Sequence, residues 1–203
     1  METVHYPRRK EFFAKVKELI TDDRSRTAIE VAYNLSKEVF RNKIRDDGER
    51  AFNHAKAVAW IIMNETNIRD QLRLTILIIC ALWHDVMEDT FAAQKKHIRF
   101  IFDQLNPDIA EVIADLTKQK DKRKKWLRLL RSMRIPTKIV KAADRLHNQR
   151  TLLGCAREKV IRKNHETRDV ILPWLRAEPT NADILQLADK IEEQTTRNEA
   201  AVN

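Results

Sequence analysis

Glycine and proline, which interrupt helices and build most turns, are scarce in this chain. Its 203 residues include only two glycines, Gly48 and Gly154, and five prolines. Apolar residues recur at helical spacing along most of the sequence, beginning with Phe12, Val16 and Ile20. A sequence this poor in turn residues cannot supply the frequent reversals that a sheet of short strands needs. It predicts an all-α protein, a compact bundle of about eight to ten helices.

The predicted helices follow these apolar stripes. Three of them begin beside Pro107, Pro136 and Pro179, because a helix tolerates proline in its first turn. After one helix around Phe12 and a long second one around Ala32, helices are predicted over 54–65, 70–87, 91–105, 108–118, 121–133, 137–152, 157–175 and 180–195. The charged segment 41–53 is predicted to be a loop, and residues 196–203 are expected to fray.

Length and cysteine usage indicate the number of domains and the cellular location of the protein. A chain of 203 residues fits one domain, 1–203, around one core. Cys80 and Cys155 lie at no metal-like spacing, so neither a disulfide framework nor a zinc knuckle is predicted, and a cytoplasmic location is expected. The start of the chain lacks the apolar core of a signal peptide, and no apolar run reaches the ~18 residues of a membrane span. We therefore expect no membrane partner.

The net charge of +9 and the pI of about 9.7 make an anionic partner plausible. A nucleotide, a nucleic acid and an acidic membrane surface all fit that charge. The densest basic run, 118–131, is interpreted as a solvated helix face or loop, with a polyanion site as the alternative. No recognition motif with interleaved aromatic residues is present, so no specific nucleic acid is expected. The sequence makes no prediction of the oligomeric state.

Four ionisable residues interrupt the most apolar stretch of the chain: His84, Asp85, Glu88 and Asp89. Burying such groups is costly unless they are paired or bind a ligand. On one continuous helix His84 and Glu88 would lie one turn apart, as would Asp85 and Asp89, so the four groups could converge on one rim. A single helix cannot complete a coordination sphere, so other segments must contribute.

Two further polar residues interrupt or open apolar helices, His54 and Asp144. With His84 and Asp85 they are predicted to bind one divalent cation. Imidazole and carboxylate together suit Mn²⁺, Fe²⁺ or Zn²⁺, and we favour Mn²⁺ because half of the ligands are hard oxygens. An adjacent His-Asp pair alone would more often be a capping or core pair, so this prediction depends on the whole set.

The order and spacing of these motifs resemble the hydrolase domain of RelA/SpoT-type stringent-response enzymes, and the length resembles stand-alone small alarmone hydrolases. The resemblance covers residues 27–175, and its anchors are RDDGERAFNH (45–54), HDVMEDT (84–90), DLTK (115–118) and KAADRLHNQRTL (141–152). It implies the helical HD-domain fold. It also implies Mn²⁺-dependent hydrolysis, at the 3′ position, of guanosine 3′,5′-bis(diphosphate) or the corresponding pentaphosphate, which releases pyrophosphate together with GDP or GTP, respectively.

The resemblance implies a role for each matching residue. The implied metal ligands are His54, His84, Asp85 and Asp144. Glu88 and Asp89 would form the catalytic pair that orients and deprotonates the attacking water. Arg45, Asn148 and Thr151 would bind the nucleotide substrate. Apart from the resemblance, we interpret His147 as a packing or hydrogen-bonding neighbour of the ligands, while Arg145 and Arg150 could bind substrate or pair with acidic neighbours.

The loop after Arg45 departs from the family pattern. A basic residue and a serine usually follow this arginine, whereas here Asp46 and Asp47 do, and Ala51 replaces an aromatic residue. Two carboxylates would repel a pyrophosphate if they pointed inward, although Arg50 could compensate. The loop therefore keeps open an HD phosphohydrolase acting on NADPH, another 3′-phosphorylated purine nucleotide or a deoxynucleotide. A third alternative is a non-catalytic nucleotide or nucleic-acid binder, against which Glu88 and Asp89 argue.

Overall fold

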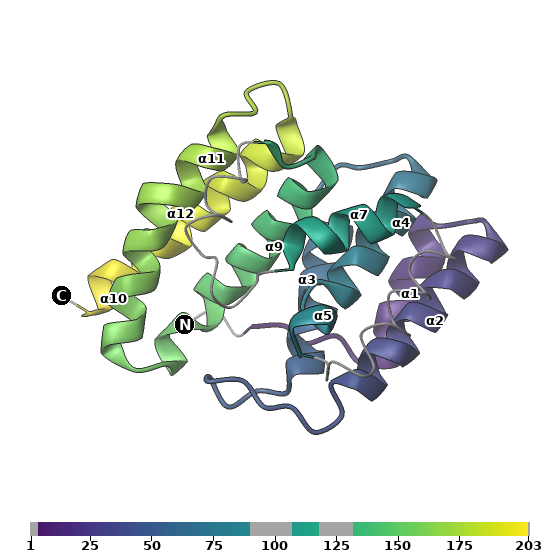
Figure 1. Cartoon of the computed structure of the whole chain (residues 1–203), viewed down its shortest axis with the longest axis horizontal. Helices are drawn as coiled ribbons and strands as arrows, with labels where there is room; N and C mark the ends of the chain where they lie inside the picture. Colours follow the sequence, from purple (N-terminus) through teal and green to yellow (C-terminus); the bar gives the residue numbers. More distant parts are fainter. Residues whose placement is uncertain (1–3, 90–106, 118–131, 203) are drawn as a thin grey trace.

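The computed structural model describes residues 4–89, 107–117 and 132–202, and every regular element within these ranges is helical (Figure 1). The all-α prediction is therefore confirmed. The α-helices are α1 (Arg9–Leu19), α2 (Asp23–Val39), α3 (Ala51–Glu65), α4 (Gln71–Trp83), α5 (Val86–Asp89), α7 (Pro107–Leu116), α9 (Ile135–Thr151), α10 (Arg157–Glu166), α11 (Leu172–Arg176) and α12 (Ala182–Val202). A 3-10 turn, η2 (Leu152–Gly154), and a π-helical turn, η3 (Thr167–Ile171), connect the later helices.

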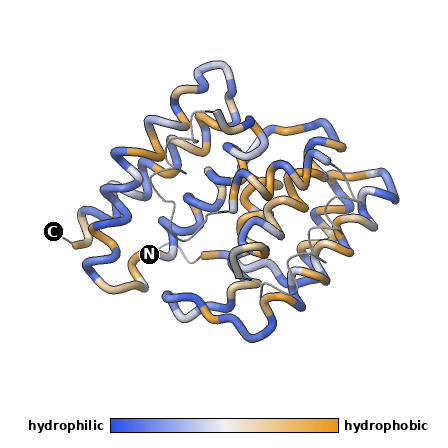
Figure 2. The backbone as a smooth tube through the Cα atoms, in the orientation of Figure 1, coloured by the Kyte–Doolittle hydropathy of each residue, from blue (hydrophilic) through white to orange (hydrophobic). Residues whose placement is uncertain are grey.

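Three helices, α3, α4 and α9, form the centre of the fold. α4 packs against α2 and α3, and α9 packs against α3 and α12. Residues 77–83 of α4 are all buried, because that helix is apolar on every side. Figure 2 shows this apolar concentration where α3 and α4 cross, whereas α10 and the loop before α3 are mainly hydrophilic. No helix among the described residues is long and apolar enough to cross a membrane.

The prediction of one helix over 70–87 is wrong, because α4 ends at Trp83 and a turn at His84 and Asp85 precedes α5. Two backbone carbonyl groups that would have accepted the next hydrogen bonds of the helix are instead in contact with side chains. The hydroxyl of Ser36 donates to the carbonyl of Leu82 (2.8 Å), and Nδ1 of His84 lies 2.7 Å from the carbonyl of Ala81. This break, rather than a helix rim, sets the direction of the His84 and Asp85 side chains.

The loop before α3 is shorter than predicted, since α3 begins at Ala51 and places His54 in its first turn. Its turn is closed by backbone hydrogen bonds from Arg45 to Glu49 (2.8 Å) and from Gly48 to Arg45 (3.0 Å). Gly48 has a φ of 84°, a conformation that costs glycine least. The loop is thereby folded back on itself beside the start of α3.

The C-terminal residues do not fray as predicted. α12 continues to Val202, and Asn198 is buried, where its amide donates to the backbone and side-chain oxygens of Gln149 (2.8 and 2.7 Å). These bonds fix the end of α12 on α9. The predicted 157–175 helix is divided by the π turn, and the predicted helices 91–105 and 121–133 and the basic run 118–131 lie outside the described residues.

Candidate metal centre and adjoining cavity

The four predicted ligands, from three separate segments, lie in one cluster. Ligand atoms of His54, His84 and Asp85 all lie within 4.8 Å of one another, and Asp144 approaches the two histidines. Nε2 of His54 on α3 lies 3.1 Å from Nε2 of His84 and 3.2 Å from Oδ1 of Asp144 on α9. Nε2 of His84 lies 3.1 Å from Oδ2 of Asp85 and 3.7 Å from Oδ1 of Asp144. The structure thus brings together all four residues from positions far apart in the sequence.

The spacing of these atoms fits one divalent cation. Two ligand atoms about 2.1 Å from a metal and at right angles to each other are about 3 Å apart. The neighbouring atoms of this cluster meet that separation, and they include both nitrogen and carboxylate oxygen donors. The donor set suits Mn²⁺, Fe²⁺ or Zn²⁺.

Both imidazoles are held with Nε2 toward the cluster. His84 directs Nδ1 to the Ala81 carbonyl, an acceptor, so Nδ1 carries its proton and Nε2 keeps a lone pair. Nδ1 of His54 lies 2.9 Å from Nδ1 of His147, which is buried. One proton must lie between these two nitrogens, and if His54 ligates through Nε2, then His54 is the donor and His147 the acceptor.

Buried positive charge favours the anionic forms of both aspartates. Burial alone would raise the pKa of Asp144, but the ammonium of Lys141 and the nearby imidazoles outweigh it and hold the pKa well below its usual range. The Nζ of Lys141 binds Oδ2 of Asp144, and the amide of Asn148 donates to Oδ1 (2.6 Å). The pKa of Asp85 is also lowered, because His84 lies beside it and outweighs the effect of burial.

The two histidines respond differently to the same surroundings. Burial lowers the pKa of His54 from 6.5 to about 4, and the hydrogen bond with Asp144 recovers only part of this shift. Burial also acts on His84, but Asp85 and Asp144 outweigh it and raise its pKa. The raised pKa favours the protonated form of His84. A cation held between these groups would replace that proton on His84, so metal binding would be coupled to proton release.

The three residues predicted to bind substrate lie together beside this centre. Nη2 of Arg45 donates to Oδ1 of Asn148 (2.6 Å), whose amide reaches Asp144. Thr151 and Arg45 both hydrogen-bond with Asp47, and these contacts help to lower the pKa of Asp47. A continuous set of polar contacts therefore links the loop before α3 to the ligand cluster.

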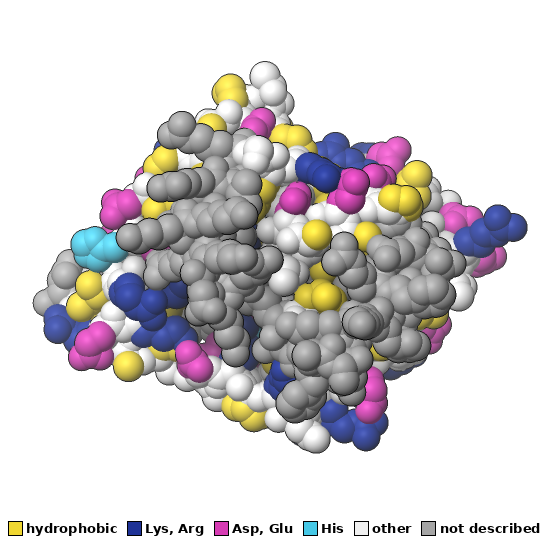
Figure 3. Space-filling view, viewed as in Figure 1, with side chains coloured by type: hydrophobic (Ala, Val, Ile, Leu, Met, Phe, Trp, Pro, Cys, Tyr) yellow, Lys and Arg dark blue, Asp and Glu magenta, His cyan; other side chains and the backbone are white. Residues whose placement is uncertain are grey.

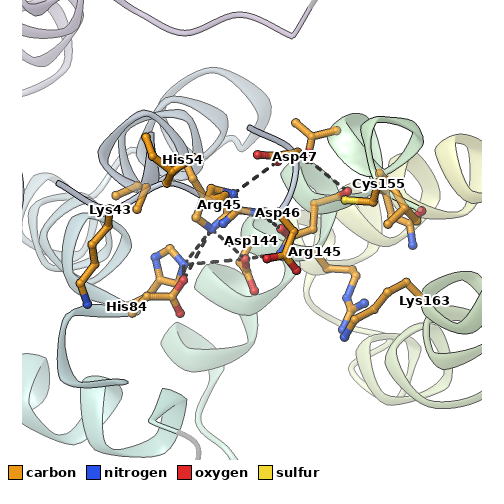
Figure 4. Close-up of a pocket in the computed structure, with 18 of the residues that line it drawn as sticks. Lys43, Arg45, Asp46, Asp47, His54, His84, Asp144, Arg145, Cys155 and Lys163 are labelled. Atoms are coloured by element: carbon orange, nitrogen blue, oxygen red, sulfur yellow. Dashed lines mark hydrogen bonds and ion pairs between the residues drawn. The ribbon is translucent and has the colours of Figure 1, made fainter. Parts of the chain in front are cut away.

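The centre opens into a cavity of about 600 Å³, a size typical of sites for small organic ligands (Figure 4). One wall of this cavity was not predicted from the sequence. It is formed by Lys159 and Lys163 of α10 and by Cys155, which lies just before that helix. The positions 155, 159 and 163 follow a spacing of four residues, a helical signal that was available in the sequence. Arg50, offered above as a compensating charge, is exposed and does not line the cavity.

Several remaining candidates have structural partners. Arg145 lines the cavity but pairs with Glu166 (2.7 Å), and Arg150 makes a two-pronged pair with Glu65 (2.6 and 2.9 Å). Glu166 and Glu65 are therefore among the acidic partners of these two arginines. The backbone of Glu88 and Asp89 lies in α5, directly after the ligand turn, and their side chains lie outside the described part of the structure.

Comparison with known proteins gives a consistent result. Residues 51–149 match the family model described as HD domain. The chain is 32% identical over 156 residues to a Brucella melitensis protein named GTP pyrophosphokinase rsh. It is 28% identical over 152 residues to a Synechocystis protein named probable guanosine-3′,5′-bis(diphosphate) 3′-pyrophosphohydrolase. Each alignment covers 70% of this chain and 19% of the relative, so the chain spans less than a quarter of their length.

A solved structure shares the fold. Its title describes a metazoan ortholog of SpoT that hydrolyzes ppGpp and plays a role in starvation responses. The TM-score is 0.64 and the identity 24%, and the superposition covers 82% of this chain and 94% of the other.

Proposed function

We propose that this chain, whose residues 51–149 match the HD-domain family model, is a guanosine 3′,5′-bis(diphosphate) 3′-pyrophosphohydrolase that uses Mn²⁺. The observation that supports the metal chemistry best is the cluster formed by His54, His84 and Asp85, with Asp144 beside the two histidines. The named activities of the Synechocystis relative and of the metazoan SpoT ortholog support the choice of substrate. Fe²⁺ or Zn²⁺ would suit the same four residues.

The reaction needs a water activated beside a phosphate. A divalent cation in the cluster would acidify a water molecule and offset the charge of the phosphate oxygens. The water oxygen forms a bond to the phosphorus next to the ribose, and the bond from that phosphorus to the 3′ oxygen breaks. The 3′ oxygen takes the bonding electrons and a proton, so that pyrophosphate and a 3′-hydroxyl result.

We assign the remaining roles to residues of this chain. Glu88 and Asp89 follow the ligand turn directly and would orient the water and accept its proton. Arg45 would place a permanently charged guanidinium against phosphate oxygens, while Asn148 and Thr151 would bind the nucleoside. Lys141 and Asn148 hold Asp144 in place from its two oxygens, so this ligand is set before substrate arrives.

An HD phosphohydrolase for another nucleotide remains the second candidate, because Asp46 and Asp47 both line the cavity. NADPH, another 3′-phosphorylated purine nucleotide and a deoxynucleotide triphosphate are its candidate substrates. These share a nucleoside and phosphate groups with guanosine 3′,5′-bis(diphosphate), abbreviated ppGpp, but they differ in where the phosphates lie. Substrate assays can therefore separate the two candidates.

The test measures pyrophosphate and phosphate release from ppGpp, NADPH and a deoxynucleotide triphosphate in Mn²⁺. The wild-type chain is compared with Glu88→Ala/Asp89→Ala, which should retain bound Mn²⁺ but lose turnover. Release of pyrophosphate from ppGpp that the double variant lacks would support the proposal. Release from another nucleotide only would replace the substrate while keeping the metal chemistry. Failure to bind Mn²⁺ at all would overturn the four-ligand assignment.

A further inference from the structure

One wall of the cavity carries two partly exposed lysines that the proposed reaction does not use, and one of them, Lys163, pairs with Glu166 on the same helix (3.2 Å). Lys159 and Lys163 lie one turn apart on α10 and both line the cavity. Figure 4 shows Lys163 on the side of the cavity away from His84, and Figure 3 shows Lys and Arg side chains gathered over α10. The wall is therefore separate from the ligand cluster, although both face the same space.

Lys159 is paired with an exposed carboxylate. Its Nζ lies 2.6 Å from Oδ2 of Asp46, and the side chain of Asp46 is 79% exposed. This pair joins the Asp46 side chain to α10. Exposed ion pairs of this kind are weak, because water screens both charges.

The adjacent aspartate behaves differently. Asp47 has a side chain only 6% exposed, accepts a hydrogen bond from the backbone of Glu49 (3.1 Å) and pairs with Arg45 (3.4 Å). Asp47 therefore belongs to the structure of the loop, whereas Asp46 is an exposed charge at its edge.

We propose that Lys159 and Lys163 form a second phosphate subsite, for the 5′-diphosphate of a nucleotide whose 3′-diphosphate lies at the ligand cluster, and that Asp46 occupies Lys159 until the substrate displaces it. The subsite rests on the proposed function, since it assumes a nucleotide phosphorylated at both ends. A phosphate carries up to two negative charges and three acceptor oxygens, whereas a carboxylate carries one charge and two oxygens. The phosphate therefore competes well for the same ammonium group.

This arrangement explains the unusual loop. The two aspartates that would repel a pyrophosphate are both neutralised, Asp47 by Arg45 and Asp46 by Lys159. Displacement of Asp46 frees the ammonium of Lys159 on α10. The wall on α10 thus supplies the positive charge that the loop lacks, and it selects nucleotides that bear a second phosphorylated group.

The experiment compares two ligands, ppGpp and guanosine 3′-diphosphate, which lacks the 5′-diphosphate. Dissociation constants are measured by calorimetry in metal-free buffer, where no hydrolysis occurs, and KM and kcat are measured in Mn²⁺. Lys159→Ala should weaken ppGpp binding by about tenfold, the size expected for one charge-assisted hydrogen bond, and raise KM with kcat unchanged. Asp46→Asn should strengthen ppGpp binding by about twofold to threefold.

Matched controls separate a local effect from a change of net charge. Lys15 pairs with Glu18 on α1, and Asp189 pairs with Arg176, and none of these residues lines the cavity. Lys15→Ala and Asp189→Asn should leave both ligands unaffected. The affinity for guanosine 3′-diphosphate should be the same in wild type, Lys159→Ala and Asp46→Asn.

Each result decides between the two proposals. Equal losses for the two ligands in Lys159→Ala would overturn the 5′ subsite, as would a loss no larger than that of Lys15→Ala. Tight binding of ppGpp that depends on Lys159, with no hydrolysis in Mn²⁺, would uphold the subsite and overturn the proposed reaction. Absence of binding for both nucleotides would overturn both.

Discussion

The two walls of the cavity are held by different kinds of interaction. The wall formed by α3, α9 and the turn after α4 is mostly buried. Three of the four ligand side chains in it, those of His54, His84 and Asp144, are fixed by a group outside the cluster, such as Lys141 or His147. The wall formed by α10 and the loop before α3 is more exposed and is joined by the Asp46–Lys159 pair. Buried contacts fix geometry, whereas exposed pairs can exchange with a ligand. The first wall is suited to chemistry and the second to recognition.

The largest effect should come from Asp144→Ala in the buried wall. This change removes a proposed metal ligand and breaks the buried ion pair between Lys141 and Asp144. Breaking a buried ion pair by removing one partner costs about 3–5 kcal/mol, so we expect a large fall in the free energy of unfolding and no detectable turnover. Denaturant unfolding and Mn²⁺ analysis would measure both effects.

Asp144→Ala/Lys141→Met serves as its partner variant. It also removes the buried ammonium, so stability should recover while Mn²⁺ binding stays lost. A single variant Asp144→Ala that folds as stably as wild type would show that the buried wall is held by other contacts.

The next effect tests whether His147 sets the tautomer of His54. His147→Asn keeps an acceptor for Nδ1 of His54, whereas His147→Ala removes it. Loss of an outer partner of a ligating histidine typically weakens metal binding about 10–100-fold, so the alanine variant should lose that much Mn²⁺ affinity and the asparagine variant less. A calorimetric titration with Mn²⁺ would measure this affinity. Equal affinities in both variants would show that His147 only fills space.

A smaller effect concerns Glu166, which joins the two walls by pairing with Arg145 and Lys163. Burial would raise its pKa, but these two cations outweigh it and lower the pKa from 4.5 to about 2. A lowered pKa stabilises the folded state above pH 4.5, and this contribution is lost as the pH falls from 4.5 toward 2. Allowing for solvent screening, we expect it to amount to about 1–2 kcal/mol.

Acid unfolding of wild type and Glu166→Gln would measure this contribution. The variant should be less stable than wild type at neutral pH, and the gap should close toward pH 2. A gap that is independent of pH would show that the carboxylate charge does not stabilise the contact between α9 and α10.

The sequence predicts the buried wall better than the exposed one, for a physical reason. Ionisable residues such as His84 in an apolar run are conspicuous, because burial without a partner is costly. Lys159 and Lys163 sit in a helix that is charged on most sides, where a functional lysine looks like any solvated one. The turn at His84 was also missed, because the competing contact to Leu82 comes from Ser36, far away in the sequence. Long-range contacts of this kind leave no local pattern.

The smallest expected effect compares the two adjacent aspartates in the loop. Asp47→Asn weakens a buried pair with Arg45 and a backbone hydrogen bond from Glu49, so the free energy of unfolding should fall by about 1 kcal/mol. Asp46→Asn removes only an exposed pair and should change it by less than about 0.5 kcal/mol. Thermal unfolding of both variants measures the difference. If Asp46→Asn destabilises the protein as much as Asp47→Asn, the carboxylate of Asp46 is part of the loop structure, and a substrate could displace it only by unfolding the loop.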